Sequence, residues 1–161
     1  MPFLTDGTLG ANLIIPTSDA EFELGTRTVA NDGSEWMYVQ ADSAGVTGAG
    51  YVVLIDEDYA ADMIETTNSA TGFGQFVGVA AVAFTASYYG WVQISGVASI
   101  RVAASAAANV ALNTTATAGV LDDDATVGAE VVNGAVLTTA DGGSGSAAAG
   151  VLNGANVGAT L

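Results

Sequence analysis

The chain has 161 residues, which is enough for one domain with a hydrophobic core and short for two. Its 17 acidic residues are set against only Arg27 and Arg101, so the formal net charge is −15 at pH 7, which argues against binding to nucleic acid or to anionic membranes. The sequence contains no histidine, cysteine or lysine, which removes Ser-His-Asp triads, thiol chemistry, imidazole metal ligands and Schiff bases. We therefore expect no enzymatic activity and no cofactor.

Residues 1–20 are predicted to form an N-terminal arm. Glycines and Pro16 interrupt this stretch, and it has neither the basic residues nor the apolar run of a signal peptide. Its apolar cluster, Leu13, Ile14 and Ile15, is too small to nucleate a core and too apolar for a simple linker. We expect the arm to be loose in the free protein and to become ordered against a partner. The alternative is that "NLII" is the first strand of the domain.

A β-domain is predicted for residues 21–127. The "NDG" turn at residues 31–33 indicates a hairpin that leads into "SEWMYVQA". Alternation along this return strand places Trp36 and Tyr38 on one face and Met37 on the other.

The strand and turn rhythm continues through the rest of this domain. "YVVLI" is a continuous apolar strand that ends at the acidic turn Asp56–Asp58. The Thr and Asn residues of "ADMIETTN" favour a strand or an irregular run over a helix. "GQFVGVAAVAF" and "YYGWVQISG" predict two more strands, with Gly96 at a bulge or a turn.

Residues 128–161 form a Gly- and Ala-rich segment that is nearly free of charge and could add strands. Asn133-Gly134 predicts one more hairpin, and "DGGSGSAAAG" predicts a linker-like loop. Turn signals recur about every 8–12 residues along the chain, as in all-β folds. The predicted fold is therefore all-β, a small β-sandwich or β-barrel with an extended N-terminal arm and this Gly-rich C-terminal segment.

Two acidic clusters are the candidates for carboxylate chemistry: Asp56–Asp58 with Asp62 and Glu65 nearby, and Asp122–Asp124. They could bind calcium or supply a catalytic pair. Calcium loops, however, need ligands at alternate positions and a glycine bend, and in the first cluster alanines stand where further ligands would help. We interpret both clusters as solvated turns and expect no metal site, with calcium binding as the alternative. "GFGQFVG" is like a nucleotide loop only superficially, because no helix pattern or basic residue follows it.

The two arginines are informative because they are scarce. A lone cation in a strongly anionic chain is attracted to carboxylates and can form bidentate pairs with them. One interpretation is that Arg27 and Arg101 form ion pairs within the chain, near strand edges. The other is that they pair with a second subunit or a partner.

Residues 22–126 contain a series of apolar segments and turns in an order that can be compared with known families. A "NDGSEWMYVQA" stretch leads to "YVVLIDED", then to "GQFVGVAAVAFTASYYGWVQISG" and "SIRVAASAAANVALNTTATAGVLDDD". This order resembles the small capsid decoration proteins of tailed bacteriophages, also called cement or head-stabilisation proteins. The resemblance implies a structural virion protein, commonly a homotrimer, made in the host cytoplasm. Such a protein binds the major capsid protein on the outer capsid surface and clamps neighbouring capsomers.

Two other functions are weighed against this one. A fibre or adhesin module that binds host glycans would need exposed aromatic side chains in a groove, and Trp36, Tyr38 and Trp91 are the candidates for it. A carboxylate-dependent hydrolase is not favoured, because a sequence without His, Cys or Lys has few catalytic side chains besides its carboxylates. The partner-binding residues expected for a decoration protein are Leu13, Ile14, Ile15, Arg27 and Arg101.

Overall fold

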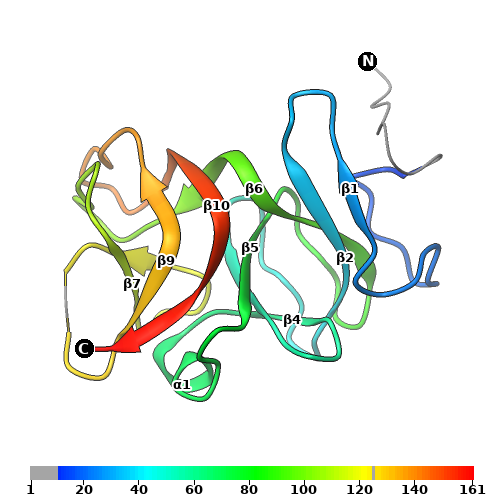
Figure 1. Cartoon of the computed structure of the whole chain (residues 1–161), viewed down its shortest axis with the longest axis horizontal. Helices are drawn as coiled ribbons and strands as arrows, with labels where there is room; N and C mark the ends of the chain where they lie inside the picture. The colour runs from blue at the N-terminus through cyan, green and yellow to red at the C-terminus, as the bar shows by residue number, and fades with distance from the viewer. Residues whose placement is uncertain (1–10, 125) are drawn as a thin grey trace.

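A computed structural model describes residues 11–124 and 126–161 (Figure 1). The fold is all-β, as predicted. The elements are β1 (Arg27–Val29), β2 (Glu35–Ala41), β3 (Val52–Ile55), β4 (Ala60–Met63), α1 (Thr66–Ser69), β5 (Phe76–Ala80), β6 (Tyr89–Arg101), β7 (Leu112–Thr114), β8 (Leu121–Asp122), β9 (Glu130–Leu137) and β10 (Ala147–Thr160). All ten strands belong to one sheet.

The first half of the sheet closes on itself. β2 pairs in parallel with β4, β4 pairs with β3, β3 with β5, β5 with β6, and β6 returns to pair with β2, so these five strands form a small barrel. Side chains that alternate inward, such as Met37, Val39, Val53, Ile55 and Val92, form one buried cluster. The barrel is therefore filled by side chains rather than hollow.

β6 continues out of the barrel into the second half of the sheet. Its residues 95–101 pair with β10, which pairs in turn with β9, and β9 with β7. The change of direction occurs near Gly96, where the register with β2 shifts and φ is +100°. A Cβ at this position would lie 2.9 Å from the Cα of Ser34, so only glycine fits. The sequence predicts a bulge or a turn at Gly96; the structure has the extra residue at Ile94, between Gln93 and Ser95, and the positive φ at Gly96 itself.

Two further clusters pack against the outside of the barrel. β3 is buried on both faces: Val53 points into the barrel, while Leu54 packs with Val77, Leu137 and Leu152 in a core shared with the second half of the sheet. On another side of the barrel, the outward-facing aromatic residues of β2 and β6 form a third cluster with Ala11, Leu13 and Ala30. The faces predicted for β2 are therefore correct, and both are buried.

The C-terminal segment, residues 128–161, is part of the sheet rather than an appendage to it. It supplies β9 and β10, and the strand pairing passes across the predicted boundary at residue 127 without interruption. Asn133-Gly134 is not a hairpin turn, which corrects the sequence prediction. Both residues lie inside β9, opposite an irregularity of β10 between Leu152 and Asn156. The positive φ of Gly134 is used for a local distortion of a long strand instead of a reversal of the chain.

The predicted linker at residues 141–150 is also different in the structure. Residues 147–150 begin β10, and the loop before them is organised by Asp141. The buried carboxylate of Asp141 accepts hydrogen bonds from the backbone N–H groups of Ser105, Gly143, Gly145 and Ser146 and from the Ser146 hydroxyl. These donors, with the Ser105 N–H first, hold the pKa of Asp141 well below its usual range.

Part of "ADMIETTN" is a single helical turn, which the sequence did not favour. β4 ends at Met63, and α1 follows with Glu65 and Asn68 in a reciprocal capping box. The Ser69 hydroxyl at the end of α1 donates to the buried carboxylate of Glu130, as does that of Thr114. This contact joins α1 to β7 and β9. The other Glu130 oxygen has no hydrogen-bond partner among residues 11–124 and 126–161.

Candidate binding surfaces

The described part of the predicted arm, residues 11–20, lies against the domain. The backbone of Thr17 exchanges two hydrogen bonds of 2.8 Å with that of Tyr89, and Leu13 is only 4% exposed in the aromatic cluster outside the barrel. Leu13 therefore belongs to the core and cannot contact a partner directly, which corrects the prediction. Ile14 and Ile15 remain exposed at 47% and 58%. Residues 1–10, the rest of the arm, lie outside the described residues.

Both arginines contact aromatic rings. The guanidinium carbon of Arg27 lies 4.8 Å from the centre of the Phe76 ring, and that of Arg101 lies 5.2 Å from the centre of the Tyr51 ring. Such stacking is favourable because the ring face is electron-rich. Neither interpretation of the arginines anticipated an aromatic partner inside the chain.

The three aromatic residues considered for glycan binding are buried. Trp36, Tyr38 and Trp91 are exposed by 8%, 1% and 2%, and Phe22 packs edge-on against both Tyr38 and Trp91. Their polar groups are used within the protein, since the Trp36 indole donates to the Ser34 hydroxyl and the Tyr38 hydroxyl accepts from the Glu21 N–H. Because these three rings are buried in the described part of the chain, they are not available to stack on a glycan, which corrects the expectation that they could line its binding groove.

An uncharged face covers the second half of the sheet. Val97 of β6, Val151 of β10 and Val136 of β9 are direct neighbours across the three strands, and all three are exposed, Val97 by 75%. The next outward residue pairs are Ser99 with Ala149 and Arg101 with Ala147. Arg101 is the one charge on these outward positions of β6 and β10.

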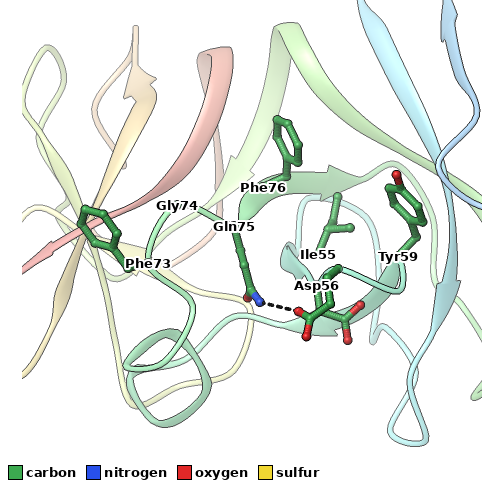
Figure 2. A pocket seen from close by; sticks show the side chains of 8 residues that line it. Ile55, Asp56, Tyr59, Phe73, Gly74, Gln75 and Phe76 are labelled. Carbon is green, nitrogen blue, oxygen red and sulfur yellow. Dashed lines mark hydrogen bonds between the residues drawn. The ribbon is translucent and has the colours of Figure 1, made fainter.

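The second surface is an aromatic hollow of about 380 Å³ beside the acidic turn between β3 and β4 (Figure 2). It is lined by Ile55, Asp56, Glu57, Tyr59, Phe73, Gly74, Gln75 and Phe76. Figure 2 shows Tyr59 and Phe76 on either side of Ile55, with Phe73 beyond Gly74. Within the described residues, the aromatic side chains that are largely exposed are Phe73 at 77% and Tyr59 and Phe76 at 37% each, and all three line this hollow.

Local structure determines how this hollow is built. The Asp56 carboxylate accepts from the N–H groups of Asp58 and Ala60 and so holds the turn that presents Tyr59. Tyr59 has a φ of +62°, and its ring covers Gly25, where a Cβ would lie 2.4 Å from the ring. Opposite this turn, the Gln75 amide donates to the Glu57 carboxylate over 3.2 Å.

A neighbouring hollow, also about 380 Å³, shares Asp56, Glu57 and Gln75 with the aromatic one. Asp42 and Asp62 line its other side. In the part of the chain that the structure describes, no group of three or more acidic side chains is arranged to hold a metal ion. In the second acidic cluster, burial of Asp122 raises the pKa of its carboxyl group.

The aromatic hollow was not predicted from the sequence. "GFGQFVG" was considered only as a nucleotide loop, whereas Phe73 precedes β5 and Phe76 begins it, and both line the hollow. The signal that could have found the site is a pair of phenylalanines separated by Gly and Gln. Such polar spacing does not fit a buried strand.

Comparison with known proteins identifies no relative: no protein family, curated protein or solved structure matches the chain. Within the described ranges, no helix has the length and apolar character needed to cross a membrane.

Proposed function

We propose that this chain is a structural virion protein that binds the outer surface of a phage capsid as a homo-oligomer, most simply a trimer, and stabilises contacts between capsomers. The segment order of residues 22–126 supports the identity of the partner, the major capsid protein. The observation that supports self-association is the exposed face formed by Val97 of β6, Val151 of β10 and Val136 of β9, called the valine face below, which carries no carboxylate. In this proposal the protein has no catalytic role.

The valine face is assigned to contacts between copies of the chain. Each copy has a net charge of −15, so two copies repel unless they meet where neither exposes carboxylates. The outward positions of β6 and β10 meet this condition, and Arg101 at their edge adds a single positive charge. Ile14 and Ile15, which project from the segment packed on the barrel, are assigned to the capsid. Many such weak contacts, repeated by symmetry, would give avidity.

The first test is whether the protein is present in purified virions at a fixed stoichiometry, by gel densitometry and electron microscopy of particles. The proposal expects a regular lattice of density on the outer capsid surface. If the protein is absent from virions, or is found only at a tail fibre, the proposal fails and the fibre or adhesin alternative takes its place.

A matched pair of variants tests the role of the valine face. Val97→Asp places a charge on the face, whereas Val127→Asp makes the same change at a fully exposed residue of a turn. We expect Val97→Asp to weaken self-association by about tenfold or more in sedimentation velocity, because a charge is buried and repeated by symmetry, and Val127→Asp to have little effect. Added salt should strengthen the wild-type oligomer or leave it unchanged. Equal effects of the two variants would contradict the assignment.

A further inference from the structure

The aromatic hollow and its acidic neighbour share Asp56, Glu57 and Gln75, so they form one continuous surface with an aromatic part and an acidic part. We infer that this surface binds an extended basic segment of a partner protein, with arginine or lysine side chains stacked on the exposed rings and paired with the carboxylates. The inference is independent of the capsid proposal, because it concerns the chemistry of the ligand and can be tested on the isolated protein.

The carboxylates of this surface have free acceptor capacity. Asp42, Asp56, Glu57 and Asp62 each use one oxygen to accept hydrogen bonds from the protein. Among the hydrogen bonds of the described residues, none engages their second oxygens. Four partly satisfied acceptors in adjoining hollows create a strongly negative potential that favours a donor-rich cation over a neutral or anionic group.

The chain has few cationic side chains that could neutralise this surface. It has no lysine, and Arg101 lies on the valine face. Arg27 stacks on Phe76, one of the residues that line the aromatic hollow. This contact shows that a guanidinium is compatible with these rings, and it leaves Phe73 and Tyr59 exposed for further cations.

The size and shape of the surface favour a peptide segment over a single ion. Each hollow has a volume of about 380 Å³, and the two meet along three shared residues. The carboxylates are not grouped as metal ligands within the described chain, so a small hard cation lacks a cage there. A segment with several basic side chains can contact both hollows at once.

A neutral glycan is the competing ligand, since sugars also stack on aromatic rings and bind carboxylates. Its hydroxyl groups would desolvate four carboxylates without neutralising their charge, and that carries a free-energy cost which a cation offsets. The observations therefore favour the basic segment, and glycan binding becomes an outcome of the test.

The probe is a synthetic peptide of alternating arginine and glycine, about six residues and ~20 Å long when extended. Its control is the same peptide with neutral citrulline in place of arginine. Binding is measured by isothermal titration calorimetry and NMR at about 0.15 M salt, where the long-range attraction of a −15 protein is screened. We expect saturable binding of the arginine peptide, about tenfold weaker binding of the citrulline peptide, and resonance shifts confined to the two hollows.

Variants separate this site from general attraction to an acidic protein. Phe73→Ala keeps the net charge and should weaken binding about three- to fivefold, because one cation–ring contact is lost. Glu57→Gln should weaken binding clearly more than Glu35→Gln, which removes the same charge from an exposed residue of β2 away from the hollows. Phe73 and Glu57 are exposed, so both variants should keep the wild-type melting temperature.

Three results would overturn the inference. The arginine peptide could fail to saturate, the two glutamate variants could weaken it equally, or Phe73→Ala could leave its affinity unchanged. A neutral oligosaccharide that binds with resonance shifts at Phe73 and Tyr59, in place of the peptide, would identify the surface as a glycan site instead.

Discussion

The barrel half and the C-terminal half of the sheet place their acidic residues differently. Eleven of the 17 acidic residues lie between Asp19 and Glu65, in the barrel half and the segments around it. In the second half of the sheet, Asp122–Asp124 lie at and after β8, and residues 128–161 contain two acidic residues, Glu130 and Asp141, which are buried acceptors of hydrogen bonds. The difference shows that the net charge of −15 does not describe the whole surface. We propose that the acidic hollows bind cations and that the face around Val97, Val151 and Val136, which carries no carboxylate, meets a second copy.

The two halves also differ in how they are packed. Outside the barrel, the rings of Tyr38 and Trp91 lie 5.1 Å apart and Phe22 packs on both, so a few large side chains cover much apolar surface. In the C-terminal half the neighbours are smaller: a Cβ at Gly150 of β10 would lie 2.6 Å from the Ile100 side chain and 2.7 Å from the Val136 carbonyl oxygen. We expect the stability of the barrel half to depend on a few rings, and that of the C-terminal half on close approach of its strands.

The largest predicted effect tests this dependence on rings. Trp91→Ala should lower the free energy of unfolding by about 3–5 kcal/mol, measured by urea denaturation, because it removes a fully buried ring from the aromatic cluster. Val110→Ala, at an exposed residue of the loop before β7, is the control, with an expected loss of about 1 kcal/mol or less. Equal losses for the two variants would show that the aromatic cluster is not a major source of stability.

How much of this architecture the sequence predicts depends on the range of the interaction. The "NDG" hairpin and the two faces of β2 follow from local turn chemistry and alternation, and both are correct; the irregularity predicted at Gly96 lies at residues 93–95. Closure of the barrel depends on pairing between β2 and β6, whose registered residues lie about 50–60 positions apart in the chain, and no local pattern specifies it.

The binding surfaces were less predictable for the same reason. The exposure of Phe73 and the burial of Trp36 depend on which segments pack over each ring, and both aromatic residues look alike in a sequence. The valine face emerges only from the register that aligns Val97, Val151 and Val136. Asn133-Gly134 shows the opposite error, since a strong local turn signal was overridden by the pairing of a long strand.

The next prediction compares one acidic residue from each half. Ser34 hydrogen bonds lower the pKa of Asp32 in the β1–β2 hairpin, and a larger set of donors lowers that of Asp141. A carboxyl group whose pKa is lower in the folded state stabilises the protein above its unfolded pKa, near 4, and this stabilisation is lost as the pH falls further. Melting temperatures measured from pH 7 to pH 2 should therefore decline below about pH 4.

Two variants assign this decline to residues. Asp141→Asn should lower the melting temperature at pH 7 and make the decline below pH 4 shallower, and Asp32→Asn should do the same to a smaller extent. If Asp32→Asn reduces the decline of the melting temperature below pH 4 more than Asp141→Asn does, the loop before β10 is not the main acid-sensitive element.

The smallest predicted effect concerns the two arginines, which make the same kind of contact in the two halves. Arg101 is half-buried over Tyr51, where its charge is partly shielded from water, whereas Arg27 is exposed over Phe76. Stacking of a cation on a ring strengthens as water is excluded, so Arg101→Gln should cost about 1–2 kcal/mol and Arg27→Gln about 0.5–1 kcal/mol in the free energy of unfolding. Each variant raises the net negative charge equally, so general repulsion cancels in the comparison. The loss of unfolding free energy should remain larger for Arg101→Gln than for Arg27→Gln at 1 M salt, because salt screens a shielded contact less than an exposed one. Should Arg27→Gln prove the more destabilising, Arg27 would be an anchor of the barrel half, and its stack on Phe76 would be structural rather than a model for cation binding in the hollow.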